Sequence, residues 1–463
     1  MIALAVRMEY QFNRRDVLRL GAAGTVVAST AGVLGSGLLA ACSTAGPGAG
    51  TPAGTSGGAG LVFLADQLSQ TTESQAMRTQ VLSGFTGGSV DFISFSETSK
   101  FITQVVAQAK AGAAKVDVIG GLQGDFVSLQ AQVPLRDMSD VIGQLADRNF
   151  PRAYLDLAKI GGAYRFVPWI TATYLMVASK QALRYLPAGA NVNALTYSQL
   201  LAWGQALKKA TGRAVLGFPA SPDGLIKRFI QGYLYPSFTG GLNTTFNSPA
   251  AVTAWQWFQQ AWAVSNPQSP TYAFMQEPLQ SGEVWVAWDH AVRLIDALKS
   301  APGQFVAFPA PIGPKGRGYL PVLGGLAIPT TSKNVAKASQ LISYLTESKT
   351  TATMLNAEAW FPPTGPGSLP PGLAPGISDE ATAIQATVSS PATIPAQLPV
   401  GLGAQSASYD KVFVDAFTAI AINNAPIPAT LTSQATTLQG ILQTANAACW
   451  KPDPVGSGVC EVG

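Results

Sequence analysis

His290 is the single histidine of the chain and directly follows Asp289, so a histidine-dependent catalytic triad would have to use this pair. Neighbouring residues rarely face one another as a triad requires, and no Gly-x-Ser-x-Gly elbow joins a predicted strand to a helix. A histidine-based zinc site would need further imidazoles. These residues predict no metal and no cofactor. They leave an exported hydrolase only as a remote alternative to a protein without catalysis.

The first 60 residues carry signals for export. Residues 13–19, Asn-Arg-Arg-Asp-Val-Leu-Arg, are close to the twin-arginine pattern, and an apolar stretch rich in small residues follows over 20–41. This order is typical of a signal peptide. Leu39-Ala40-Ala41-Cys42 resembles a lipobox, so we expect residues 1–41 to be removed and lipid on Cys42 to anchor the protein to the outer face of the cell membrane. Residues 42–60 are rich in Gly, Ser, Thr, Ala and Pro and predict a flexible tether, while translation could start at Met1 or Met8.

Two cysteines remain once Cys42 is assigned to the lipid anchor. Cys449 and Cys460 would close a short loop that contains Pro452 and Pro454. An exported protein meets an oxidising compartment, where such a disulfide forms and contributes about 3 kcal/mol in the chain-entropy model. The alternative is a pair of free thiols.

The bulk composition limits the class of protein. The chain has 463 residues, of which 47% are hydrophobic and only 12% are charged, and its formal net charge is +4. This low charge and high apolar content exclude a disordered chain, and no basic patch supports binding to nucleic acid. The length is sufficient for two lobes, each with its own core.

Alternating apolar segments predict an α/β fold. Short strand-like runs alternate with amphipathic helical stretches, which favours mainly parallel sheets flanked by helices. Ser248 and Pro249 predict a helix start, and Trp255, Trp257 and Trp262 are assigned to the core. The expected strands are 61–64, 90–95, 116–119, 174–178 and 284–288, and the expected helices are 72–85, 101–111, 333–346 and a final region over 409–448.

Several short segments occur in the order found in one family. They are Val116-Asp117-Val118, residues 135–138, 164–168, Phe246-Asn247-Ser248-Pro249, and residues 282–288, 309–314 and 324–329. In this order the chain resembles the extracellular solute-binding proteins of sugar importers, the relatives of maltose-binding protein. The resemblance implies two α/β lobes with a ligand cleft and hinge, formed by 61–168 plus 310–345 and by 172–305 plus 349–463. The turn after Trp288 departs from the family, which usually has Gly followed by Trp there.

Candidate ligand-binding residues follow from this resemblance and from the rule that open α/β sheets bind ligands at the carboxyl ends of their strands. Acidic and amide groups would bind hydroxyls, aromatic faces would stack on a sugar ring, and glycine N–H groups would approach closely. Each could instead be a solvated loop residue, a helix cap or part of the hinge packing. The candidates are Asp66, Gln67, Glu97, Gln123, Asp125, Trp169, Tyr174, Asp289, His290, Arg293, Gly324, Gly325, Trp360 and Phe361.

The implied function is capture without catalysis. A monomeric lipoprotein would bind a mono- to oligosaccharide between its lobes and deliver it to the membrane subunits of an ABC permease. A glycerophosphodiester or another phosphorylated polyol is the alternative ligand, for which Arg293, Lys315 or Arg317 could supply the cation.

Overall fold

The computed structural model describes residues 60–463 except 70, 111–114, 364–368 and 370–371. The predicted signal peptide, the lipidation site Cys42 and nearly all of the tether therefore lie outside the described residues. Within the described part, no helix combines the length and the apolar character that crossing a bilayer requires.

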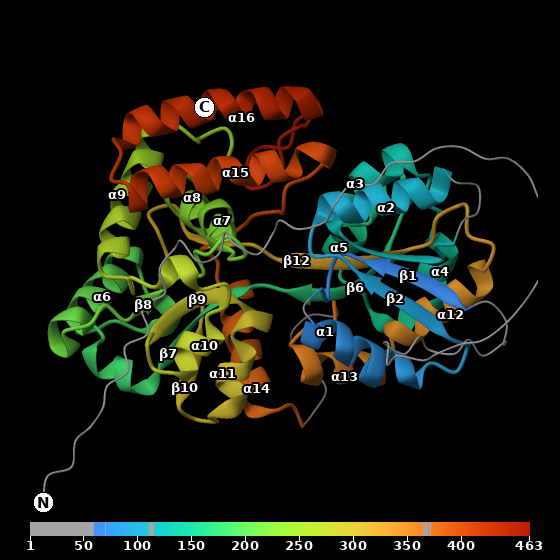
Figure 1. The fold of residues 1–463 in the computed structure, drawn as a ribbon, viewed down its shortest axis with the longest axis horizontal. Helices are drawn as coiled ribbons and strands as arrows, with labels where there is room; N and C mark the ends of the chain where they lie inside the picture. Colours follow the sequence, from blue (N-terminus) through green and yellow to red (C-terminus); the bar gives the residue numbers. More distant parts are fainter. Residues whose placement is uncertain (1–59, 70, 111–114, 364–368, 370–371) are drawn as a thin grey trace, which may run out of the picture. The chain divides into compact units, whose positions relative to one another are not determined.

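The first lobe is built on a five-stranded sheet in the order β2-β1-β3-β12-β6 (Figure 1). β1 pairs in parallel with β2 and β3, whereas β12 runs antiparallel to β3 and β6. Leu64 and Ile119 pack on one face with α2 and α3, and Phe63 and Val118 pack on the other with α12. The strands are β1 (Leu61–Ala65), β2 (Val90–Ser94), β3 (Val118–Leu122), β6 (Val167–Ala172) and β12 (Val322–Ala327), and the helices are α2 (Thr98–Lys110), α3 (Gln123–Gln132) and α12 (Val335–Leu345).

The second lobe has a four-stranded sheet in the order β10-β7-β9-β8. β7 is antiparallel to both β9 and β10, and only β8 and β9 are parallel. The two-lobed α/β prediction with mainly parallel sheets is confirmed. In each sheet one strand runs against the others, β12 in the first and β7 in the second. The chain passes from β6 of the first sheet through Thr173 into β7 of the second sheet. The strands are β7 (Tyr174–Ser179), β8 (Leu216–Gly217), β9 (Val286–His290) and β10 (Phe305–Phe308).

Further elements complete the two lobes. The other helices are α1 (Thr71–Ala76), α4 (Ser139–Gln144), α5 (Arg152–Leu157), α6 (Tyr197–Thr211), α7 (Ile226–Phe229), α8 (Tyr235–Thr239), α9 (Pro249–Ala263), α10 (Gln276–Gln280), α11 (Ile295–Ser300), α13 (Ser348–Glu358), α14 (Pro375–Val388), α15 (Ser406–Phe417) and α16 (Ile427–Ala445). The π-helical turns are η1 (Met77–Val81), η6 (Ile230–Leu234) and η11 (Thr418–Ile422), and the short strands are β4 (Lys159–Ile160), β5 (Ala163–Tyr164), β11 (Arg317–Tyr319) and β13 (Thr393–Pro395).

The predicted helix start at Ser248 and Pro249 is confirmed. The Ser248 hydroxyl accepts a hydrogen bond from the Ala251 N–H, and Pro249 is the first residue of α9. Trp255 and Trp257 are buried as predicted, while Trp262 is only partly buried and packs edge-on against Phe417. A local cap signal therefore positions a helix whose aromatic face lies in the core.

Two strand predictions need correction. The strand expected over 116–119 is β3, which begins at Val118 and continues through Gly120 and Gly121 to Leu122. A Cβ atom at Gly120 would lie 2.9 Å from the Phe63 ring, so glycine is needed at this position of the strand. The strand expected over 284–288 runs instead over Val286–His290. Asp289 therefore lies inside β9 and does not cap the following helix.

The predicted lobe boundaries stay a prediction, although two sets of contacts bear on them. The Ile312 N–H donates to the Leu195 carbonyl at 2.8 Å and β11 pairs with β13, so residues 312–319 lie among second-lobe elements. α13 packs against α1 and η1 of the first lobe. These contacts favour moving 312–319 to the second lobe and α13 to the first.

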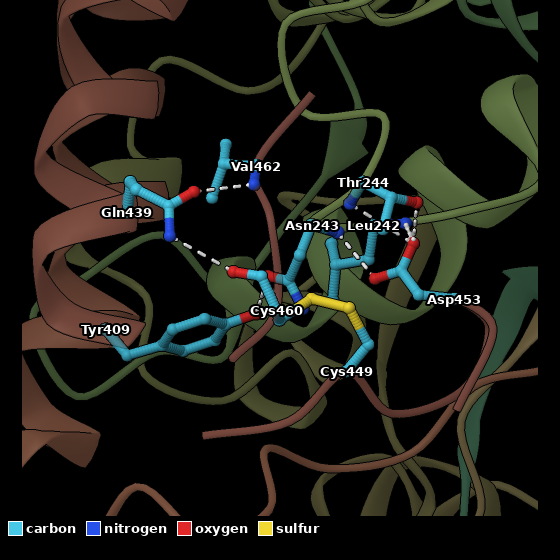
Figure 2. The surroundings of a disulfide bond; sticks show 9 residues. All are labelled: Leu242, Asn243, Thr244, Tyr409, Gln439, Cys449, Asp453, Cys460 and Val462. Atoms are coloured by element: carbon cyan, nitrogen blue, oxygen red, sulfur yellow. Dashed lines mark hydrogen bonds between the residues drawn. A yellow bond between two sulfur atoms is a disulfide. The ribbon is translucent and has the colours of Figure 1, made fainter. Parts of the chain in front are cut away.

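The C-terminal segment after α16 is held on the second lobe by a disulfide and by hydrogen bonds to one buried carboxylate. Figure 2 shows the predicted disulfide between Cys449 and Cys460, which the structure confirms. Within the loop that it closes, the buried carboxylate of Asp453 accepts hydrogen bonds from the N–H groups of Leu242, Asn243 and Thr244 and from the Thr244 hydroxyl (Figure 2). The loop after α8 and the chain terminus thus depend on each other.

Candidate functional site

Both lobes line a cavity of about 520 Å³, a size within the usual range for small-molecule sites. The first lobe contributes the residues that follow β1, the start of α2 and the first turn of α3. The second lobe contributes the start of β7, the end of β9, α7 and one face of α15. The cavity therefore lies where the carboxyl ends of parallel first-lobe strands meet the second lobe.

The segment before α15 brings the lobes into contact at the rim of this cavity. The Gly403 N–H donates to the Ser128 hydroxyl of α3 at 3.2 Å. A Cβ atom at Gly124 would lie 2.3 Å from the Pro399 carbonyl oxygen, so only glycine permits this approach. The described conformation is thus one in which the lobes touch beside the cavity.

Two carboxyl groups meet on the first-lobe wall. Asp66 follows β1, and Asp125 lies in the first turn of α3. Exclusion of water raises the pKa of Asp66 well above its usual value, and the nearby Asp125 raises it further. Desolvation also raises the pKa of Asp125. Because like charges at close range disfavour double ionisation, this carboxyl pair retains a proton more readily than separated carboxyls would.

Two hydrogen-bond acceptors in the same wall have no partner among the described residues. The Gln67 side-chain amide donates to Asp66, and the Thr98 hydroxyl donates to the same carboxylate at 3.4 Å. Within the described part of the chain, Gln67 Oε1 and Asp125 Oδ2 are inaccessible and accept no hydrogen bond. A buried acceptor without a donor is costly, so this wall is suited to a ligand that brings donors.

The cations on the opposite wall already have partners. Arg228 of α7 forms two 3.0 Å hydrogen bonds to the Asp410 carboxylate of α15, and Lys227 lies 3.3 Å from the same group. Although burial alone would raise it, the charges of Arg228 and Lys227 hold the pKa of Asp410 below its usual value. Lys411 pairs with Asp415 at 2.6 Å.

Arg293 is also engaged. Its guanidinium donates to the carbonyls of Asp223 and Ala273, each at 3.1 Å, and lies 4.5 Å from the centroid of the Phe274 ring. Every Lys and Arg that lines the cavity therefore contacts an acceptor supplied by the protein, and an anionic ligand would have to compete for it.

Aromatic side chains form the floor between the walls. Tyr174 stacks on Trp288 with ring centroids 4.9 Å apart, and His290 packs edge-on against Tyr174 and beside Trp360. Burial, assisted by the charge of Arg293, lowers the pKa of His290 to about 3, so this ring is neutral near pH 7. The indole N–H of Trp360 is buried without an acceptor among the described residues and could donate to a ligand oxygen.

More of the predicted ligand-binding residues line the cavity than lie away from it. Ligand contact by any of these residues stays a prediction. The candidates that line the cavity are Asp66, Gln67, Glu97, Asp125, Tyr174, His290, Arg293 and Trp360.

Four other candidates lie in packed positions. Gln123 is buried at the start of α3, and Trp169 packs against Phe63 in the first-lobe core. Gly324 and Gly325 lie within β12, where added side chains would meet Ile170 and Phe166. None of the four is among the residues that line the cavity.

Phe361 and Asp289 also lie away from the cavity lining. Phe361 forms a β-bridge with Thr171. Asp289 is fully buried and accepts hydrogen bonds from the N–H groups of Met275 and His290. Both carboxylate oxygens of Asp289 are thus occupied by backbone donors, which does not fit the carboxylate of a triad with His290.

Sequence reasoning missed the charged residues of the second-lobe wall, Lys227, Arg228, Asp410 and Lys411. Adjacent pairs of charged residues are conspicuous in a chain with only 12% charged residues, and this was the available signal. It could not show that α7 and α15, separated by 182 residues at the Arg228–Asp410 pair, meet in the fold.

Comparison with known proteins gives a consistent result. Residues 83–372 match the family of bacterial extracellular solute-binding proteins. Maltose-bound MalE3 of T. maritima is similar in structure, with 17% sequence identity and a TM-score of 0.67 over 82% of this chain and 99% of that one. UgpB of Mycobacterium tuberculosis in complex with glycerophosphocholine has 20% identity and a TM-score of 0.61 over 84% and 100%.

The GacH receptor of Streptomyces glaucescens, solved unliganded and with acarbose, has 15% identity and a TM-score of 0.64 over 83% of this chain and 98% of that one. Sequence comparison with curated proteins gives no match. At these identities the structural likeness establishes the two-lobed fold and leaves the ligand to be argued from the cavity.

Proposed function

Because the chain belongs to the bacterial extracellular solute-binding proteins, we propose that it captures an uncharged carbohydrate between its lobes and delivers it unaltered to an ABC permease. The observation that carries this proposal is the asymmetry of the cavity. The first-lobe wall has inaccessible acceptors at Gln67 and Asp125, while the cations of the second-lobe wall already have partners. Once these side chains turn their oxygens toward the cavity that they line, ligand hydroxyl groups donate to them, and the floor of Tyr174 and Trp360 suits the apolar face of a sugar ring.

The same asymmetry disfavours the glycerophosphodiester alternative. A phosphate group gains most from an arginine that can bind it through two hydrogen bonds. Arg228 uses that geometry for Asp410, and Arg293 uses its donors for backbone carbonyls. Of the cations named for this alternative, Lys315 and Arg317 are not among the residues lining the cavity, and Arg317 is buried with a bond to the Asn193 carbonyl.

A thermal-shift screen tests the proposal. A series of neutral mono-, di- and oligosaccharides is compared with glycerophosphocholine and glycerol phosphate. We expect at least one neutral saccharide to raise Tm, because a ligand at about 100 times its Kd stabilises the folded state by about 2.7 kcal/mol. The phosphate-bearing compounds should leave Tm unchanged. A rise with phosphate-bearing compounds alone would establish the alternative, and no rise with any saccharide would refute sugar capture.

We further propose that Cys42 carries the lipid anchor. Two acyl chains on one cysteine give stable membrane attachment, so Cys42→Ser should move the protein from the membrane to the soluble fraction and abolish incorporation of labelled palmitate. Ser43→Ala, one residue away, is the matched control and should behave as wild type. Wild-type protein that takes up no label, or a Cys42→Ser variant that stays with the membrane, would contradict the anchor.

A further inference from the structure

Helix α13 (Ser348–Glu358) is shared between the lobes. It contacts α1, η1 and α12 of the first lobe. Leu355 and Ala359, at its C-terminal end, belong instead to the apolar cluster formed with Leu298 of α11 and Ile377 of α14. Both α11 and α14 pack against β10 of the second sheet. Besides the crossing at Thr173, a change in the angle between the lobes must therefore also be accommodated near the end of α13.

The ammonium group of Lys299 bridges this junction. Lys299, in the last turn of α11, donates from Nζ to the Asn356 carbonyl at 2.6 Å and to the Ala357 carbonyl at 3.4 Å. Carbonyls in the last turn of a helix have no partner within the helix, and the helix dipole places partial negative charge there. A second-lobe cation thus occupies the C-terminal end of a helix that packs on the first lobe.

Two buried acids flank this cation. Glu358 of α13 is 4% exposed and Glu380 of α14 is 0% exposed, and their four carboxylate oxygens have no hydrogen-bond partner in the described structure. The charge of Lys299 acts on both groups. The other charged groups that act on this cluster are Asp296 of α11, Asp379 of α14 and Glu73 of α1, the last of which lines the cavity.

Burial shifts the pKa values of all three groups toward their neutral forms, lowering that of Lys299 and raising those of the two acids. Burial raises the pKa of Glu358 to about 9, with a further contribution from the charge of Glu73. Burial also raises the pKa of Glu380 well above its usual value. Glu358 is therefore neutral near pH 7, the raised pKa of Glu380 favours its neutral form as well, and the ammonium has the carbonyls of α13 as its hydrogen-bond acceptors.

We infer that Lys299 is a positioning residue that holds the two lobes in the arrangement seen here, through its hydrogen bonds to the end of α13. Loss of these bonds shifts the population toward a more open arrangement. A second consequence rests on the proposed capture of a solute between the lobes. The shift also weakens solute binding, although Lys299 does not touch the solute, because the apparent affinity falls with the fraction of protein in the binding-competent arrangement. Lys299 itself is not among the residues that line the cavity.

Small-angle scattering of the ligand-free protein tests this inference. Lys299→Met keeps the apolar stem and removes the ammonium, so the radius of gyration should increase while the circular dichroism spectrum stays as in wild type. Lys299→Arg keeps a cation with donors and should restore the wild-type value. Lys337→Met, at an exposed lysine of α12, is the matched control and should change nothing.

A second variant covers the case in which Lys299→Met does not fold. Lys299→Gln keeps N–H donors without the charge and should give a smaller increase in the radius of gyration. Wild-type scattering from whichever of these two variants folds would overturn the inference. Loss of the fold in both would also overturn it, since Lys299 would then be required for folding. The measurement uses no ligand, so its failure leaves sugar capture standing, and a failed saccharide screen leaves this result standing.

Discussion

Asp125→Ala is expected to weaken saccharide binding by about 10- to 100-fold while leaving the ligand-free protein at least as stable as wild type. The affinity falls because the variant lacks a buried acceptor, and a ligand hydroxyl left without an acceptor in the cavity costs about 1–3 kcal/mol. Stability does not fall, because the carboxyl is held in an unfavourable environment. Calorimetric titration gives the affinity, and ligand-free Tm gives the stability.

The pH dependence of this stability difference follows from the raised pKa of Asp125. Between the pKa of the unfolded chain and the higher pKa of the folded protein, the unfolded carboxyl loses its proton more readily than the folded one, so folding becomes less favourable as pH rises through this window. Removal of the group should therefore raise Tm more at about pH 7 than near the unfolded pKa, about 3.9.

Asp91→Ala, at an exposed acid of β2, is the matched control for Asp125→Ala. It should change neither affinity nor the pH dependence of Tm. A variant at Asp125 that binds saccharide as tightly as wild type would remove the first-lobe wall from the proposed site. A ligand-free Tm well below wild type would show that Asp125 has a structural role.

Local signals explain why much of the fold could be predicted. Ser248 and Pro249 specify the start of α9 by bonds within one helical turn, and the apolar runs after Gly60 and Ser89 specify β1 and β2 by their composition. The limits of β3 could not be obtained in this way. Glycines usually interrupt strands, but Gly120 is required because the Phe63 ring occupies the space of its side chain.

The site was predicted less completely, because strand limits decide which face a residue occupies. β9 extends two residues beyond its predicted end, to His290. Trp288 and His290 of this strand lie next to Tyr174, while the Asp289 carboxylate accepts a hydrogen bond from the Met275 N–H. Arg228 pairs with Asp410 because α15, which lies far from α7 in the sequence, packs beside α7 at the cavity. No local pattern encodes such a contact, although it decides which cations remain for a ligand.

The carboxylate of Asp453 connects the C-terminal segment to the loop between α8 and α9. Its oxygens accept from the N–H groups of Leu242 and Asn243 at 2.9 and 2.7 Å, and from the hydroxyl of Thr244 at 2.6 Å. Leu242 and Asn243 are buried, so their N–H groups have no access to water if the carboxylate is removed. The chain terminus is held in the same place, since the Asn247 N–H donates to the Gly463 carbonyl at 2.6 Å.

Asp453→Ala should therefore lower the free energy of unfolding by about 2–6 kcal/mol, since each of the two buried N–H groups left without an acceptor costs about 1–3 kcal/mol. Chemical denaturation at fixed pH measures the change. Glu461→Ala, at an exposed acid of the same segment, is the matched control and should stay close to wild type. The disulfide closes the loop that carries Asp453, so reduction should cost the wild type more than the variant, in which the loop has lost its anchor. Additive losses would show that the disulfide and the carboxylate stabilise the terminus independently, and a small loss for Asp453→Ala alone would show that water replaces the carboxylate.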